Sequence, residues 1–222
     1  MTDFYIDKQI QAIRDLHRDI LSYDFATLSV IELLEAQSQT LVEAHRQGKD
    51  EVLFHLACWS PDHIGLPSDD IAGNPLTIEQ ARESMAREYG FDSWSQAKMK
   101  GNVLLDVGFE SAIESLVHGR LNELQIAIRA KPQLVRQKSQ FGHQATLLHY
   151  LGANGVETQR QVTPYNAVDI AQWLVDAGAE VNAVANIYGG SAVLGLVETS
   201  VHPANAGVTE ALAGVLRSLG AQ

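Results

Sequence analysis

Two segments in the second half of the chain decide the fold class: residues 145–155 read ATLLHYLGANG, and residues 167–182 read AVDIAQWLVDAGAEVN. Thr146 is a favourable N-cap for a first short helix, because its side chain can accept a hydrogen bond from the backbone of the first turn. Gly155 and Gly178 stand just past predicted helix ends, where glycine adopts left-handed backbone at little cost. Helix pairs of this size cannot bury their apolar faces alone, so the pattern predicts a stack of repeated helical units.

Together the two segments resemble an ankyrin repeat. The family pattern is T-P-L-H-x-A-A-x-x-G, followed by a second helix and by L-L-x-x-G-A-D-V-N. The residues that match this pattern, in order, are Thr146, Leu148, His149, Gly155, Leu174, Gly178, Ala179, Val181 and Asn182. Leu147 stands where the family has proline. The resemblance implies that the His149 ring bonds to the backbone of the neighbouring repeat.

About ten residues, 156–165, separate the two predicted helices, where the family has a much shorter connection. The insertion contains several polar residues, so we expect an exposed loop. Insertions in repeat proteins map to loops and often to a binding face. The alternative is a tolerated length variant, because doubling the length of a loop costs only about 0.6 kcal/mol.

Further repeat-like units lie on either side. The Gly-Ala pairs at residues 178–179 and 220–221 mark equivalent positions, which gives about three units over residues 105–222. The segment YGFDSW at residues 89–94 is similar to one that precedes the repeats in a group of bacterial ankyrin-repeat proteins. That group shares no established activity, so the resemblance implies a fold and not a chemistry.

The rest of the chain also has helical periodicity. Ile6, Ile10, Ile13 and His17 recur at spacings of three and four, which places them on one face of a helix. The helices expected over the whole chain span residues 4–22, 27–46, 50–59, 78–89, 93–101, 109–117, 121–130, 147–154, 167–177, 193–199 and 207–218. Residues 60–77 are rich in turn-forming residues and are predicted to be a loop.

These patterns predict an all-α protein, an ankyrin-type α-solenoid with short hairpin fingers. We expect three parts. Residues 1–77 form an N-terminal helical region that packs as a cap on the repeats, residues 78–104 are linker helices that include the Tyr89–Trp94 motif, and residues 105–222 are the repeat region.

The composition of the 222 residues restricts the class of protein. A single cysteine, Cys58, allows no intrachain disulfide, which favours a reducing compartment. No signal peptide and no membrane-spanning run is visible, so we expect a cytoplasmic protein that binds no membrane. The net charge of −11 argues against nucleic-acid binding. Residues 1–80 alone carry a balance of −9, from five Lys and Arg against fourteen Asp and Glu.

The sequence offers little sign of catalysis. His55, Cys58 and His63, with Asp62 as a possible fourth ligand, have residue types that bind zinc, and Cys58 with His55 could be a nucleophile and its base. Neither arrangement has the paired ligands of a structural zinc site or a recognised nucleophile signature, so a helix end with a buried cysteine is the simpler interpretation. Gly189-Gly190 lacks the spacing of a phosphate-binding loop and is predicted to be a hairpin turn. We therefore expect no enzyme activity, no cofactor and no metal.

The leading hypothesis is a module that binds an unidentified protein partner. The alternatives are an enzyme or metal site near His55, Cys58 and His63, and a purely structural or oligomerising unit. In ankyrin stacks the finger tips and the first helices form the binding surface. The residues expected there are Gln140, Phe141 and His143 in one finger, Tyr150 and Asn154 on the first helix, Gln159, Arg160 and Tyr165 in the insertion, and Asn186, Ile187 and Tyr188 in the next finger. The acidic first 80 residues could instead attract a basic partner.

Overall fold

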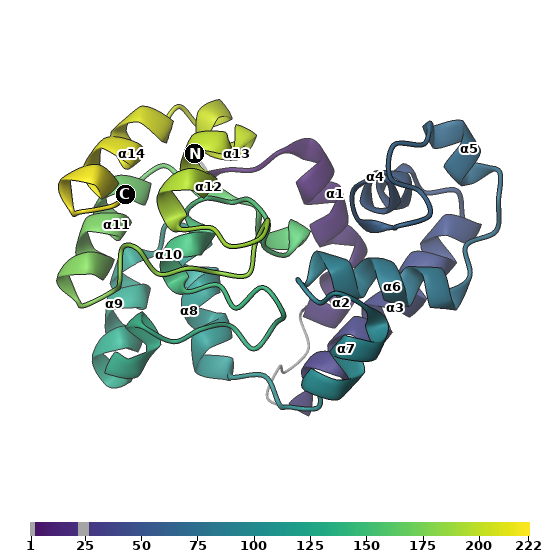
Figure 1. Ribbon diagram of the computed structural model, residues 1–222, viewed down its shortest axis with the longest axis horizontal. Coiled ribbons are helices and arrows are strands. Elements are labelled where there is room, and N and C mark those ends of the chain that lie inside the picture. Colours follow the sequence, from purple (N-terminus) through teal and green to yellow (C-terminus); the bar gives the residue numbers. More distant parts are fainter. Residues whose placement is uncertain (1–2, 22–26) are drawn as a thin grey trace. The chain divides into compact units, whose positions relative to one another are not determined.

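A computed structural model describes residues 3–21 and 27–222, and most of these residues are helical, as the sequence predicts (Figure 1). In chain order the elements are β1 (Phe4–Tyr5), α1 (Lys8–Leu16), α2 (Arg18–Leu21), α3 (Val30–Arg46), α4 (Asp50–Trp59), α5 (Ser68–Ala72), α6 (Ile78–Glu88), α7 (Trp94–Lys100), α8 (Val107–Val117), α9 (Leu121–Ala130), α10 (Leu147–Tyr150), β2 (Thr163–Pro164), α11 (Ala167–Asp176), α12 (Val193–Thr199), α13 (Val201–Asn205) and α14 (Thr209–Ser218). Single 3-10 turns add Pro132–Val135 and Thr158–Arg160.

The helix expected over residues 4–22 is wrong at its start. Phe4 and Tyr5 form β1, an antiparallel strand that pairs with β2. Asp3, which could have been an N-cap, instead accepts a hydrogen bond from the backbone N–H of Tyr165 through its own carbonyl. This long-range pairing competes with helix formation, so α1 begins only at Lys8. Residues 23–26, which connect the helices expected over residues 4–22 and 27–46, lie outside the described residues.

Several helix boundaries are confirmed, and two short helices were not expected. The side chains of Thr77 and Ser93 cap α6 and α7. Helix α5 lies within the stretch predicted to be a loop, and α13 follows directly after α12. Helix α10 ends at Tyr150 rather than at residue 154, because the chain turns away and reaches a φ of 44° at Ala153.

By their internal contacts, the residues form two compact units. The α3 unit consists of Lys8–Leu105 with Gln140–Gly142, and the α8 unit consists of the segment up to Asp7, Asp106–Ser139 and His143–Gln222. The expected packing of residues 1–77 as a cap stays a prediction. Among residues 3–21 and 27–222, no helix combines the length and the apolar composition needed to cross a bilayer.

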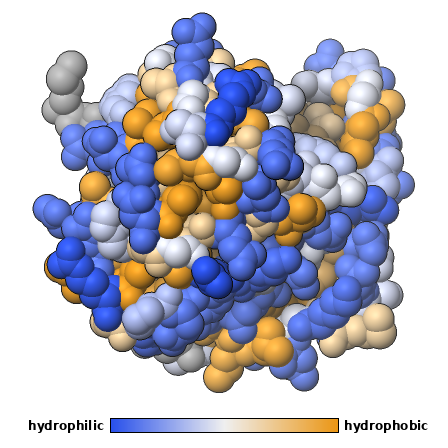
Figure 2. Space-filling view, turned by 60° about the vertical axis from the view of Figure 1, so that its left-hand side comes forward, coloured by the Kyte–Doolittle hydropathy of each residue, from blue (hydrophilic) through white to orange (hydrophobic). Residues whose placement is uncertain are grey.

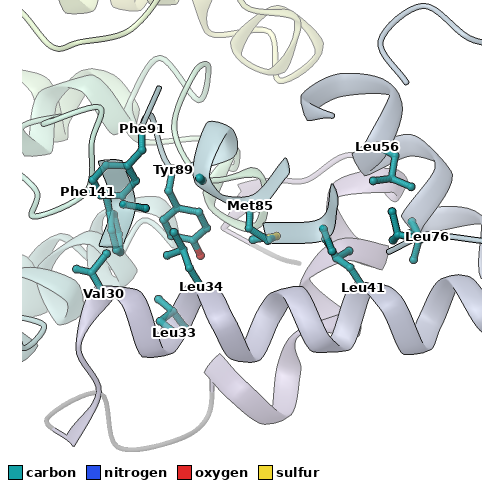
Figure 3. Close-up of a cluster of buried hydrophobic side chains, with 14 of the residues drawn as sticks. Val30, Leu33, Leu34, Leu41, Leu56, Leu76, Met85, Tyr89, Phe91 and Phe141 are labelled. Atoms are coloured by element: carbon teal, nitrogen blue, oxygen red, sulfur yellow. The ribbon is translucent and has the colours of Figure 1, made fainter. Parts of the chain in front are cut away.

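Helices α3 and α6 build the core of the α3 unit. Figure 3 shows Leu34 and Leu41 of α3 directed toward Met85 and Tyr89 at the α6 side. All four side chains are fully buried. Burial of one such side chain stabilises a fold by roughly 1.5–3 kcal/mol, so the packing of α3 on α6 contributes substantially to the stability of the unit.

The YGF part of the YGFDSW motif belongs to the same core. Gly90 has a φ of 76°, a conformation that lets Tyr89 and Phe91 both turn into the core. Gly142 packs directly against the Gly90 backbone. A side chain at position 142 would not fit there, because its Cβ would lie 2.4 Å from the Gly90 carbonyl carbon. Phe141 then meets the Tyr89 ring edge-to-face at a centroid distance of 4.7 Å.

The α8 unit contains the segments that resemble ankyrin repeats. Helix α10 packs against α8 and α12, and α14 packs against α11 and α12. Figure 1 shows α9, α11 and α14 in one row with α8, α10 and α12 beside them. On the face drawn in Figure 2, hydrophobic residues reach the surface as separate patches between hydrophilic ones.

The ends of α11 and α14 have the same hydrogen-bonded cap. The N–H of Ala179 donates to the carbonyl of Leu174, and the N–H of Ala221 donates to the carbonyl of Leu216. Gly178 and Gly220, which precede these two alanines, have φ values of 105° and 96°. The two caps are therefore one motif used twice, 42 residues apart, as the Gly-Ala pairs of the sequence suggest.

His149 joins the loop before α10 to the finger before α12. Its Nδ1 accepts a hydrogen bond from the backbone N–H of Thr146 at 3.1 Å. The proton is therefore on Nε2, which donates to the carbonyl of Ser191 at 3.2 Å. Burial lowers the pKa of His149 to about 4, so the ring stays neutral and keeps this tautomer.

Replacing His149 with Ala should lower the free energy of unfolding by about 1–3 kcal/mol, because the buried Thr146 N–H loses its partner and the Ser191 carbonyl loses one of its two donors. His45 makes a single bond, of 3.3 Å to the Ile71 carbonyl, from a half-buried position, so His45→Ala is the matched control and should cost less. Urea denaturation of both variants measures the difference. Equal losses in the two variants would show that His149 has no special structural role.

Candidate functional site

The structure separates the eleven expected partner-binding residues into two groups. Six are buried and cannot contact a partner through their side chains; these are Phe141, His143, Tyr150, Gln159, Arg160 and Ile187. Tyr165, Asn186 and Tyr188 are exposed, and Gln140 and Asn154 are half-buried. Gln140 and Phe141 lie in the α3 unit, whereas the other nine belong to the α8 unit.

The expectation of an exposed insertion is wrong. Residues 156–160 and 162–164 are buried, and only Tyr165 is exposed. The polar composition is misleading, because Glu157 and Arg160 turn inward and find partners of opposite charge. The insertion is thus part of the core of the α8 unit and not a loop on its surface.

Arg160 lies at the centre of a buried ionic cluster. Its Nη1 donates to Glu110 Oε2 at 2.6 Å and to Glu157 Oε1 at 3.1 Å, and its Nε donates to Glu114 Oε1 at 3.0 Å. The Tyr150 hydroxyl also donates to Glu157 Oε1, at 3.2 Å. Arg160 and two of its three carboxylate partners are at most 4% exposed.

The cluster affects the pKa values of its two buried carboxylates in opposite directions. Burial by itself would raise the pKa of Glu157, but the neighbouring His143 and Arg160 lower it to about 2, so this carboxylate is ionised. Burial raises the pKa of Glu110 despite the attraction of Arg160. His143 Nε2 lies 3.4 Å from Glu157 Oε2. His143, Tyr150 and Arg160, which were expected to contact a partner, therefore hold the insertion in place.

Glu110 and Glu114 were missed by the sequence analysis. The sequence does contain a sign that Glu110 is buried. Glu110 stands three residues before Ile113 and seven before Val117, which places it on the apolar face of α8. A carboxylate on such a face needs a buried partner, but the sequence does not say that Arg160, fifty residues later, is that partner.

Two of the three exposed residues, Asn186 and Tyr188, lie in the second finger, residues 185–191. Ala185 and Ser191 pair through two backbone hydrogen bonds, and the N–H of Gly190 donates to the carbonyl of Ile187 at 2.9 Å. The chain therefore reverses at Tyr188 and Gly189, which have φ values of 49° and 82°. The hairpin turn expected here is confirmed, although Tyr188 occupies its first central position.

Tyr188 and Asn154 are two expected site residues whose side chains form a hydrogen bond. The Tyr188 hydroxyl donates to Asn154 Oδ1 at 2.8 Å, while 69% of the Tyr188 residue surface stays exposed. Ile187 is buried beneath the turn, where it lies close to Gly155. The backbone N–H of Asn186 donates to the carbonyl of His143 at 2.7 Å, which anchors the base of the finger.

The structure does not assemble His55, Cys58 and His63 into one site. His63 Nδ1 lies 2.7 Å from Ser60 Oγ, and His55 Nε2 lies 2.8 Å from Ser84 Oγ. Within the described ranges, no three His, Cys, Asp or Glu side chains form a group that could hold a metal ion. Cys58 is exposed, so the expectation of a buried cysteine at this helix end is wrong. Partial desolvation and the nearby Glu88 still raise the pKa of its thiol, which disfavours the thiolate that a nucleophile requires.

Ser84, His55 and Glu88 are arranged like a Ser–His–acid triad. His55 Nδ1 lies 3.5 Å from Glu88 Oε2, on the opposite side of the ring from Ser84. All three residues are at most 1% exposed, so no substrate can reach Ser84. The arrangement therefore links α4 and α6 through the Ser84–His55 hydrogen bond and has no access for chemistry.

Two neutral histidines lie in this core. Burial lowers the pKa of His17 to about 4, and burial together with the adjacent His17 lowers the pKa of His55 to about 3. Neither ring nitrogen of His17 has a hydrogen-bond partner among the described residues. His17 therefore occupies an unfavourable environment at every pH.

Replacing Arg160 with Met should lower the free energy of unfolding by about 3–5 kcal/mol, because Glu110 loses its cation and Glu157 keeps only His143 as a positive neighbour. Arg82→Met is the matched control. Arg82 also binds a carboxylate through two nitrogens, at 2.6 and 2.7 Å from Glu35, but both side chains are about 30% exposed. The control should cost about 1 kcal/mol or less. Chemical denaturation compares the two, and equal costs would contradict a central role for Arg160.

Acid should destabilise the protein through His17 and His55. Their folded pKa values lie below the unfolded value of 6.5, so unfolding takes up protons below that pH. The free energy of unfolding should be constant above pH 6.5 and fall toward pH 4, by at most about 3 kcal/mol for His17. His17→Leu should reduce this fall and should not destabilise the protein at pH 7.5. Parallel pH dependences for wild type and His17→Leu would refute the assignment.

Comparison with known proteins gives no relative. No family model matches the chain, and neither a curated protein nor a solved structure matches it. The function is therefore inferred from the residues and contacts of the chain itself.

Proposed function

We propose that the chain is a protein-binding module and that its recognition surface is the tip of the second finger. The surface consists of Tyr188 with Asn154 and Asn186 beside it. The proposal rests on one observation. The Tyr188 side chain is exposed, although its backbone has a positive φ, which is unfavourable for tyrosine. Exposed tyrosines that are held in place are frequent anchors of protein interfaces.

The conformation of Tyr188 is costly for this residue type. Tight hairpin turns with positive φ at both central positions favour Asn-Gly or Gly-Gly, because other side chains clash with their own backbone there. A bulky residue in this region costs on the order of 1–3 kcal/mol. The ring gains little from packing, since most of it faces solvent. A role of the side chain in binding would explain why a tyrosine occupies position 188.

An ankyrin-type arrangement of the α8 unit supports the same surface. The repeated caps after α11 and α14 and the His149 bond to Ser191 are what stacked units of this kind would make. The first finger, residues 139–145, is closed by a bond from the Ser139 N–H to the Ala145 carbonyl, which corresponds to the Ala185–Ser191 pair. Stacked helical repeats commonly bind partners on such a surface.

Tyr188→Gly should separate binding from stability. Glycine adopts positive φ freely, so the free energy of unfolding should stay the same or rise by about 0.5–1 kcal/mol. Binding should weaken, because the anchor is removed. Wild type and Tyr188→Gly are immobilised, and the proteins that each captures from a lysate are identified by mass spectrometry. The dissociation rate of a captured partner is then measured for both proteins.

Ile126→Ala is the control for loss of an exposed apolar side chain. Ile126 lies on α9 and is 67% exposed, close to the value for Tyr188. We expect a partner whose dissociation from Tyr188→Gly is faster while its dissociation from Ile126→Ala is unchanged. A partner that leaves all three proteins at one rate would show that the finger is not the site. Phe141→Ala does not serve as a test, because this buried ring supports the α3 unit.

A further inference from the structure

The N-terminal segment, residues 3–7, binds to the α8 unit as an extended peptide. It precedes α1, which belongs to the α3 unit, yet its own contacts are with the α8 unit. The Tyr165 N–H donates to the Asp3 carbonyl at 3.0 Å, and β1 then runs antiparallel to β2 with Phe4 opposite Pro164 and Tyr5 opposite Thr163.

The surface that receives this segment is here called the β2 face, and it consists of His118, Gly119, Thr163, Pro164, Tyr165 and Asn205. It accommodates both aromatic side chains of the segment. The Phe4 ring meets the His118 ring edge-to-face at 4.9 Å, and the Tyr5 hydroxyl accepts a hydrogen bond from Asn205 Nδ2 at 3.1 Å. Gly119 leaves room for the backbone, since an added Cβ would lie 3.3 Å from the Asp3 carbonyl oxygen.

The segment is held weakly compared with the elements around it. Residues 4–7 are half-buried, and β1 has two residues. Pro164 has no N–H, so β2 offers few donors to its partner. Two-stranded pairs of this size are marginal unless side chains add to them. By contrast, β2 itself stays in place through the buried Arg160 cluster that precedes it.

We propose that the β2 face is a docking site for an extended peptide segment with two adjacent aromatic side chains, and that residues 3–7 occupy it within the same chain as an internal competitor. The partner adds as an antiparallel strand, as peptides do at exposed sheet edges. The aromatic pair gives specificity through His118 and Asn205. This site is separate from the finger surface, so neither proposal depends on the other.

Competition within one chain sets the size of the expected effect. A tethered segment has an effective concentration on the order of millimolar, so an external peptide meets a largely occupied site. Its apparent affinity is reduced by the fraction of chains whose site is empty. Weakening the internal segment should therefore strengthen the binding of an external one.

The probe is a peptide with the sequence of residues 3–9, DFYIDKQ, with both ends blocked. It is titrated to about 1 mM into the isotope-labelled full chain, as wild type and as Phe4→Ala, and the backbone amide signals of Tyr165 and Gly119 are followed by NMR. We expect these signals to shift in Phe4→Ala at a peptide concentration at least about tenfold lower than in wild type. A peptide with Ala in place of its Phe should shift them much less.

Met99→Ala is the matched control, because Met99 is 78% exposed and lies in the α3 unit. This variant should respond to the peptide as wild type does. No shift at Tyr165 or Gly119 in a folded Phe4→Ala, or equal titrations of Phe4→Ala and wild type, would overturn the proposal.

Hydrogen exchange of wild type covers the case in which Phe4→Ala does not fold. If residues 3–7 leave the β2 face on their own, the Tyr165 amide exchanges faster than the Ala179 amide in the cap after α11. Exchange of both amides at one rate, that of global unfolding, would show that the segment is a permanent part of the core and would overturn the proposal.

Discussion

The ion pair between Arg160 and Glu110 fixes the insertion, and the insertion fixes much of the α8 unit. A buried guanidinium is tolerated only where carboxylates surround it, so Arg160 can occupy only one place relative to α8. Strand β2 follows three residues later, and the N-terminal segment pairs with β2. Loop-closure entropy alone would make an insertion of this length nearly neutral. The desolvation of its charges, and not its length, makes it essential to the fold.

Helical periodicity predicted most of the fold because the main helices are long and amphipathic. Helix α4 has the bounds that were expected, and the caps of α6 and α7 follow from the residues Thr77 and Ser93. Helices α5 and α13 have five residues each, too few for a periodic pattern to be distinct from a turn. Strand β1 was missed because its partner lies about 160 residues away, and no local pattern encodes such a pairing.

The site was predicted less well, because residue type was used as a guide to exposure. Phe141, His143 and Tyr150 are typical interface residues, but each has a buried role that depends on a distant partner: Tyr89 for Phe141 and Glu157 for the other two. Tyr188 is different because its exposure follows from local geometry. The β-turn at the tip of this finger leaves the Tyr188 side chain exposed, and Gly189-Gly190 marks the turn in the sequence.

Two of the unfavourable environments in the chain differ in accessibility, and this difference decides how each is interpreted. His17 is buried with no hydrogen-bond partner for its ring among the described residues, and Tyr188 has an unfavourable backbone conformation. Either one lowers stability. His17 is 1% exposed, so its side chain cannot contact another molecule. The exposed Tyr188 side chain can do so without any rearrangement. Strain at an exposed aromatic residue is thus a better indication of recognition than a perturbed group in the core, even one arranged like a catalytic triad.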